Sequence, residues 1–146
     1  MNHFNYTTTC KTVLGDVYTP VSTYLKMRDK YPLSALMESS DYHSSDNSRS
    51  FIALNPIADI AIGHGKVSCK YPDGTLTEKE ITETYRVEDA MNEFLSCFTV
   101  EGEKSNLCGL YGYTAFNAVR YFENIQVKDT TMKKNDAPDM YYILYK

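Results

Sequence analysis

The sequence predicts an α+β fold with a mainly antiparallel sheet and about three helices, and three observations support this prediction. Apolar residues recur at helical spacing in two places, near residues 20–30 and 87–98. Between these two segments lie short apolar or alternating runs, separated by turns that contain glycine, proline and asparagine. Strands gathered in one section, with helices before and after it, are typical of α+β folds.

The first predicted helix covers residues 20–30. Thr19 is a good N-cap, and Pro20 suits the first helical position. One face is apolar with a charged end, at spacing i, i+3, i+4 and i+7: Val21, Tyr24, Leu25 and Arg28. Pro32 should stop the helix, because the residue before a proline is pushed out of the α region.

A section of strands follows this helix. We expect strands at residues 33–38, 50–54, 57–62 and 66–71, and a further one within 75–82. Gly63-His64-Gly65 should form a hairpin turn, and Pro72-Asp73-Gly74 a second turn. In 66–71, Val67, Cys69 and Tyr71 alternate with polar residues, and this period of two indicates a strand with one wet face.

The strongest helical pattern lies at residues 87–98. Its apolar residues fit one helix face: Val87, Ala90, Met91, Phe94, Leu95 and Phe98. Glu88 and Asp89 in the first turn suit the helix dipole. We expect a strand at 107–113 to follow, then a helix from Thr114 to about Phe122. A polar connection at 123–138 should come next.

The last segment, residues 140–145, is apolar on both of its strand faces. Met140, Tyr142 and Leu144 alternate with Tyr141, Ile143 and Tyr145. Such a strand should be buried on both sides. Natural termini are usually polar and frayed. We therefore interpret a chain that stops at Lys146, directly after this strand, as truncated.

Length and composition narrow the class of protein. With 146 residues, the chain fits a single domain over 1–146. The net charge of −4 comes without a concentrated basic stripe, which argues against nucleic-acid binding. No signal peptide and no apolar run of membrane length are present, so we expect a cytoplasmic protein without membrane partners. Four cysteines without a CxxC pair indicate reduced thiols.

Most candidate sites in the sequence have a simpler explanation. Asp41, His43 and Asp46 match no known metal-ligand spacing and lie in a polar loop, so no metal site is expected. No arrangement of a catalytic nucleophile with a base is indicated either, and we name no catalytic residue. Glu38 differs, since it directly follows an apolar strand and could meet a cationic ligand group. Local sequence alone still favours an ordinary surface glutamate there.

Four segments resemble, in order and spacing, the amino-terminal region of anthranilate synthase component I. Residues 19–28 are similar to its TPVxxYxKL helix, and 36–40 to its LLES motif. Residues 48–56 are similar to SRYSFIGxNP, and 109–123 with 137–140 to GGLxGYxxYDxVRYFE…DxPDM. The chain departs from these patterns in three places, listed by position: Met37 stands for the second leucine, Ser50 follows Arg49 directly, and Asn117 replaces a common aspartate.

The resemblance implies a parent enzyme that is a lyase of tryptophan biosynthesis. Members of the family make anthranilate from chorismate, with ammonia that a separate glutamine amidotransferase, component II, delivers. Chorismate and Mg²⁺ belong to the carboxy-terminal catalytic part, which we expect to be missing here. This chain would then be inactive alone and would need its own catalytic part as a partner.

The resemblance also implies a feedback site for L-tryptophan. Carried over by position, Glu38 and Ser39 of the LLES match would lie at that allosteric site, and Arg49 near it. Glu38 can pair with an ammonium group, and Ser39 can hydrogen-bond the ligand's polar end. Arg49 can hold a carboxylate or orient Glu38. Because the family shares this pocket between both parts of the enzyme, we expect weak tryptophan binding by this chain alone.

Two alternatives stay open at the level of sequence. One is the equivalent part of aminodeoxychorismate synthase component I, which shares the LLES-type region. The other is a free-standing domain that binds a small ligand or a protein. The matches over residues 19–28 and 109–123 favour anthranilate synthase component I over aminodeoxychorismate synthase component I.

Overall fold

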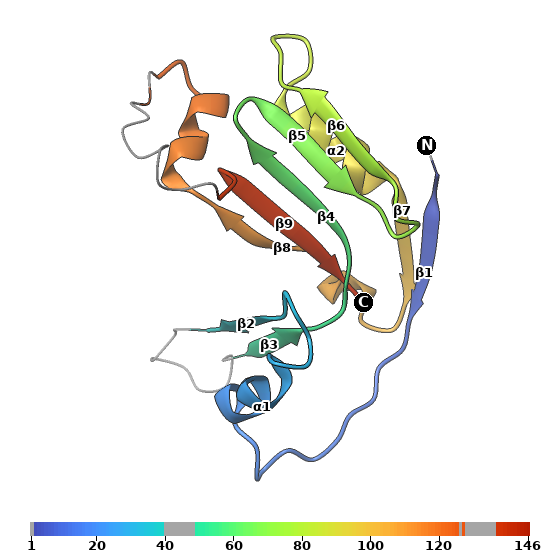
Figure 1. Cartoon of the computed structure of the whole chain (residues 1–146). Coiled ribbons are helices and arrows are strands. Elements are labelled where there is room, and N and C mark those ends of the chain that lie inside the picture. The colour runs from blue at the N-terminus through green and yellow to red at the C-terminus, as the bar shows by residue number, and fades with distance from the viewer. Residues whose placement is uncertain (1, 40–48, 126, 128–136) are drawn as a thin grey trace. The chain divides into compact units, whose positions relative to one another are not determined.

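The computed structural model describes residues 2–39, 49–125, 127 and 137–146 (Figure 1). Its helices and mostly antiparallel strands confirm the predicted α+β class. The chain divides into two compact units, Met1–Thr9 with Ile57–Leu144 and Cys10–Pro56 with Tyr145–Lys146. The expectation of one regulatory domain over 1–146 stays a prediction.

The larger unit contains a five-stranded sheet in the order β6-β5-β4-β9-β8. The strands are β4 (Pro56–Gly63), β5 (Lys66–Lys70), β6 (Leu76–Glu80), β8 (Leu110–Thr114) and β9 (Met140–Tyr145). The β4–β5, β5–β6 and β8–β9 pairs are antiparallel. His64 and Gly65 connect β4 to β5 with φ of 53° and 73°, as a two-residue type I′ turn requires. The predicted hairpin is therefore confirmed.

Helix α2 (Val87–Ser96) packs against β5 and β7 and closes the core of the larger unit. Its predicted apolar face is correct for Val87, Ala90 and Phe94, which are buried, but not for Leu95, which is 46% exposed. These side chains meet Ile60 and Ile62 of β4, which are fully buried. The sequence placed the end of this helix at residue 98, but the helix ends at Ser96.

Two strands, β1 (Phe4–Thr8) and β7 (Phe98–Gly102), were not predicted. They pair in parallel, with Phe4 opposite Phe98. Phe98 therefore belongs to a strand and not to the predicted helix. Its ring lies 5.5 Å from that of Phe4 and 5.2 Å from that of Phe94. The side chain therefore still packs beside Phe94 of α2, although its backbone is extended and not helical.

The segment after β7 differs in detail from the prediction. The predicted strand at 107–113 is β8, which a short 3₁₀ helix, η2 (Ser105–Leu107), precedes. The predicted helix from Thr114 is instead a 3₁₀ helix, η3 (Phe116–Tyr121). Most of the polar connection at 123–138 lies outside the described residues.

A hydrogen-bond network fixes η3 to the start of β9. The Tyr121 hydroxyl donates to Asp139 Oδ2 at 2.9 Å and accepts from the Gly65 backbone N–H at 3.4 Å. Arg120 Nε lies 4.0 Å from the same carboxylate oxygen. Arg120 and Tyr121 thus meet Asp139, and all three belong to the fourth segment that resembles the family.

Strand β9 lies between β4 and β8 in the sheet. Met140 and Leu144 are buried in the main core, and Ile143, which alternates with them, is also buried. The prediction that this strand is buried on both faces is correct for these side chains. Its tyrosines are half-buried.

The smaller unit holds α1 (Pro20–Met27) and a hairpin of β2 (Ala35–Glu38) and β3 (Ser50–Ala53). The predicted cap is confirmed as a capping box. Thr19 Oγ1 accepts from the Ser22 N–H at 3.1 Å, and Ser22 Oγ accepts from the Thr19 N–H at 3.2 Å. The helix ends at Met27, earlier than the predicted residue 30. Among the described residues, no helix is both long and apolar enough to cross a membrane.

Candidate ligand site at the β2–β3 hairpin

The β2–β3 hairpin brings together the two segments that carry the predicted site. Glu38 is opposite Ser50 in the antiparallel register. The pairing continues one step further, where the Ser39 backbone N–H donates to the Arg49 carbonyl oxygen at 3.2 Å. Glu38, Ser39 and Arg49 therefore lie at the same end of one hairpin, although eleven positions separate the first from the last in the sequence.

Strand geometry sorts these three residues onto two faces. Successive side chains of a strand point to opposite faces, and directly opposed residues share a face. Ser39 and Arg49 therefore share one face, and Glu38 and Ser50 share the other. Glu38, Ser39 and Arg49 are all exposed. Between Glu38 and Arg49, which both belong to the described residues, the structure has no ion pair, so Arg49 does not orient Glu38 directly.

The other end of the hairpin is held by backbone features that the sequence analysis did not identify. Leu33 and Asn55 flank the two strands with φ of 58° and 57°, in the left-handed region. This conformation is common for asparagine and rare for leucine. The Leu33 carbonyl accepts the Tyr145 hydroxyl at 2.7 Å, and the Asn55 carbonyl accepts the Lys146 N–H at 3.0 Å. Burial raises the pKa of Tyr145, which keeps this hydroxyl protonated as a donor.

The Tyr24 hydroxyl ties α1 to the same hairpin. It donates to the Ser34 carbonyl, one residue before β2, at 3.2 Å. Tyr24 is the half-buried member of the predicted apolar face, whereas Val21 and Leu25 are 46% and 49% exposed. The helix thus supports the hairpin that carries the candidate site.

The weaker candidate that the sequence offered for a metal site, Asp41 with His43 and Asp46, lies outside the described residues. In the part of the chain that the structure describes, no group of three or more His, Cys, Asp or Glu side chains could hold a metal ion.

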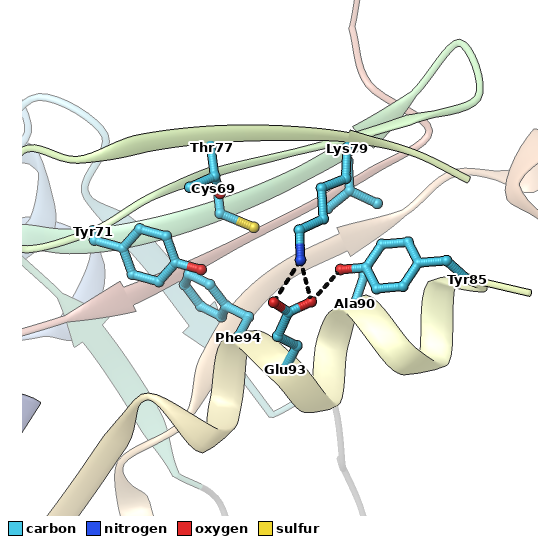
Figure 2. Close-up of a pocket in the computed structure, with 9 residues that line it drawn as sticks. Cys69, Tyr71, Thr77, Lys79, Tyr85, Ala90, Glu93 and Phe94 are labelled. Atoms are coloured by element: carbon cyan, nitrogen blue, oxygen red, sulfur yellow. Dashed lines mark hydrogen bonds and ion pairs between the residues drawn. The ribbon is translucent and has the colours of Figure 1, made fainter. Parts of the chain in front are cut away.

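A second polar cluster, which the sequence did not reveal, lies between β6 and α2 in the larger unit (Figure 2). Lys79 Nζ donates to both carboxylate oxygens of Glu93, at 2.6 and 2.7 Å. The Tyr85 hydroxyl donates to Glu93 Oε2 at 2.5 Å, and Lys79 Nζ lies 5.0 Å from the centre of the Tyr85 ring. The hydrogen bond from Lys79 lowers the pKa of Glu93, whereas burial raises the pKa of Tyr85.

This second cluster is structural rather than a ligand site. The cavity that Cys69, Tyr71 and the cluster line has a volume of about 10 Å³, room for one water at most. Burial raises the pKa of Tyr71 to about 12 and also raises that of the Cys69 thiol, so both groups stay neutral at neutral pH. Lys79 and Glu93 instead clamp α2 to an edge strand of the sheet.

The fold and the hairpin together define an α+β module with a candidate site for a small charged ligand. The chain is similar to "Anthranilate synthase component 1" of Lactococcus lactis subsp. lactis (strain IL1403), with 31% identity over 144 residues. The alignment covers 92% of this chain but 28% of the relative, in its amino-terminal region. The predicted resemblance to that region is therefore confirmed. No family model and no solved structure matches the chain.

Proposed function

We propose that the chain forms the amino-terminal, L-tryptophan-sensing part of an anthranilate synthase component I. Its parent would be a lyase that makes anthranilate from chorismate in tryptophan biosynthesis, with ammonia from a glutamine amidotransferase partner. The similarity over 92% of the chain supports the parent's identity. The observation that carries the sensing role is the β2–β3 pairing, which brings Ser39 and Arg49 together on one hairpin face.

The chemistry of the hairpin end suits an amino acid. The Arg49 guanidinium can donate two parallel hydrogen bonds to a carboxylate, and the Ser39 hydroxyl can donate a further one. Glu38, the last residue of β2, points to the other face of the hairpin, so we propose that it acts on the ammonium group through its negative charge and not by direct contact. An exposed hairpin end provides only part of a pocket, so the catalytic part would supply the remaining contacts.

Feedback inhibition needs tryptophan to bind more tightly to a less active form of the whole enzyme. The hairpin would carry the part of the site that recognises charge, while catalysis would take place elsewhere. Mg²⁺ belongs to the proposed catalytic part. The described residues contain no group of three or more His, Cys, Asp or Glu side chains that could hold this ion.

The proposal is tested by tryptophan titration of the full-length parent enzyme. Losing a hydrogen bond to a charged group costs about 1.5–3 kcal/mol, which corresponds to a roughly 10- to 150-fold higher inhibitory concentration. We expect Arg49→Ala and Ser39→Ala to show this rise, and Glu38→Ala to relax inhibition as well. Turnover without tryptophan should stay close to that of the unmodified enzyme.

Arg28→Ala is the matched control, because Arg28 is another exposed arginine of the same unit but follows α1 and lies outside the hairpin. Unchanged inhibition in both Arg49→Ala and Ser39→Ala would exclude this site. An enzyme that makes aminodeoxychorismate, with no response to added tryptophan, would instead support the sister-enzyme interpretation.

A further inference from the structure

The side-chain pattern of the β2–β3 hairpin does not fix the register of its two strands. Leu36 is opposite Ile52 on one face of the hairpin, and Met37 is opposite Phe51 on the other. All four side chains are half-buried, so both faces are apolar to a similar degree. Register is strongly specified where one face alone is buried, because a slip by one residue then exposes the apolar side chains. The register of this hairpin therefore has to be set at its ends.

At the base of the hairpin, two residues with left-handed backbones are opposite each other. The β2–β3 register, extended by two residues beyond the strands, sets Leu33 against Asn55. Their φ angles are 58° and 57°. Neither residue has the extended backbone of a strand, so together they define where the pairing begins. The base is therefore an end at which the register can be fixed.

Leu33 is poorly suited to the conformation that it adopts. It is the third residue of a turn from Tyr31 to Ser34, in which the Ser34 N–H donates to the Tyr31 carbonyl at 3.2 Å. Proline at the second position and a positive φ at the third are typical of a type II turn, whose third residue is normally glycine or asparagine. For a leucine, the left-handed region costs free energy. The turn therefore needs contacts from outside itself to keep Leu33 in this conformation.

The end of β9 supplies such contacts, one for each residue of the base. The Tyr145 hydroxyl donates to the Leu33 carbonyl at 2.7 Å. The Lys146 backbone N–H donates to the Asn55 carbonyl at 3.0 Å. Tyr145 and Lys146 are consecutive, and both belong to the smaller unit together with the hairpin. A single strand end thus holds both sides of the base and fixes them relative to each other.

We propose that the end of β9 locks the register of the β2–β3 hairpin, so that Tyr145 and Lys146 are positioning residues of the proposed tryptophan site. Without the Tyr145 hydroxyl, Leu33 would relax from the left-handed region, and the strands could slip by one residue. In a slipped register, Ser39 and Arg49 would no longer share a face and could not bind one carboxylate together. The effect on tryptophan binding rests on the proposed function, whereas the lock itself rests on the contacts at the base.

Disulfide cross-linking in the full-length parent protein reports the register directly. Leu36→Cys with Ile52→Cys reports the observed register, because these residues form a non-hydrogen-bonded pair whose side chains lie close together. Leu36→Cys with Phe51→Cys, or with Ala53→Cys, reports a slip by one residue in either direction. We expect a slipped cross-link to form about 2- to 13-fold faster when Tyr145→Phe is added, which corresponds to the loss of one hydrogen bond.

Matched variants separate the lock from a general loss of stability. Tyr113→Phe removes a hydroxyl that also donates to a backbone carbonyl, but in the larger unit, and should leave the rate of slipped cross-linking unchanged. Lys146→Pro removes the N–H that donates to Asn55 and should raise this rate, whereas Lys146→Ala keeps the N–H and should not. Leu33→Gly removes the cost of the left-handed turn, so adding it to Tyr145→Phe should restore part of the observed register.

The cross-linking rates decide whether the lock exists. Faster slipped cross-linking in Tyr145→Phe than in Tyr113→Phe, or in Lys146→Pro than in Lys146→Ala, supports it. The absence of both differences would overturn it. If circular dichroism shows that Tyr145→Phe does not fold, the two Lys146 variants decide alone.

Tryptophan titration of the parent enzyme then tests the effect on the site. Only hairpins in the observed register would bind, so the inhibitory concentration for Tyr145→Phe should rise by the inverse of their fraction. Turnover without tryptophan should stay unchanged. If Arg49→Ala relaxes inhibition but a slipped Tyr145→Phe enzyme does not, the positioning role is refuted. If neither variant relaxes inhibition, the proposed tryptophan site fails, while the cross-linking rates still decide on the lock.

Discussion

Truncation of Phe94 to alanine should cost more stability than any single change on the exposed face of α2. Phe94 is 1% exposed, and its ring lies 5.5 Å from that of Tyr71 and 5.2 Å from that of Phe98. Its neighbours come from separate strand segments of the sheet framework, so they cannot easily move into the vacated space. We therefore expect a loss of about 3–5 kcal/mol, of which each aromatic contact contributes about 0.5–1.5 kcal/mol.

Urea unfolding followed by circular dichroism measures this loss. With a slope of about 2 kcal/mol/M, the midpoint for Phe94→Ala should fall by about 1.5–2.5 M while the slope stays unchanged. The control is Leu95→Ala, the next residue on the same helix, which is 46% exposed and should cost less than about 1 kcal/mol. Equal midpoint shifts for the two variants would refute the packing of α2 described here.

Three further predictions concern the larger unit. The hydrogen bond from Lys79 lowers the pKa of Glu93 from its ordinary 4.5, so the stability that Glu93 provides is present above that pH and is lost as the pH falls below it. Urea unfolding at acidic pH should therefore show a smaller loss of unfolding free energy for Glu93→Gln than for the unmodified chain. The pKa of Tyr71 is raised from 10.0 to about 12, so the stability that this hydroxyl provides is present below pH 10.0 and is lost as the pH rises toward 12. In alkali, the unfolding free energy of Tyr71→Phe should therefore fall less than that of the unmodified chain. A Cβ at Gly112 would lie 1.9 Å from the Tyr141 carbonyl oxygen, so Gly112→Ala should lower the unfolding free energy by more than about 2 kcal/mol. Gly109→Ala meets no atom within 4 Å and should change it little, and similar losses for both variants would contradict the close approach of β8 and β9.

The elements that the sequence predicted best are those whose signals are local. The cap at Thr19 fixed the start of α1, and the His64-Gly65 turn fixed the β4–β5 hairpin. The apolar spacing from Val87 to Phe94 identified the buried face of α2. Each of these signals depends on hydrogen bonds or periodicity within a few residues, so neighbouring sequence is enough to recognise it.

The errors occur where a distant partner decides the local structure. Phe98 continues the helical spacing of α2, but pairing with Phe4 makes it the first residue of a strand. The Lys79–Glu93 clamp likewise joins a strand to a helix through residues with no shared local pattern. In both cases the stabilising contact comes from a segment that a reading of nearby residues does not include.

For the candidate site, sequence and tertiary structure contributed different things. The sequence by itself identified Glu38, Ser39 and Arg49, through motifs that resemble one family, and it placed Glu38 at the end of a strand. Only the fold decided that Ser39 and Arg49 are opposite one another, with Glu38 on the alternate face. The physical reason is the register of the β2–β3 pair, because a shift of one residue would exchange the faces of these side chains.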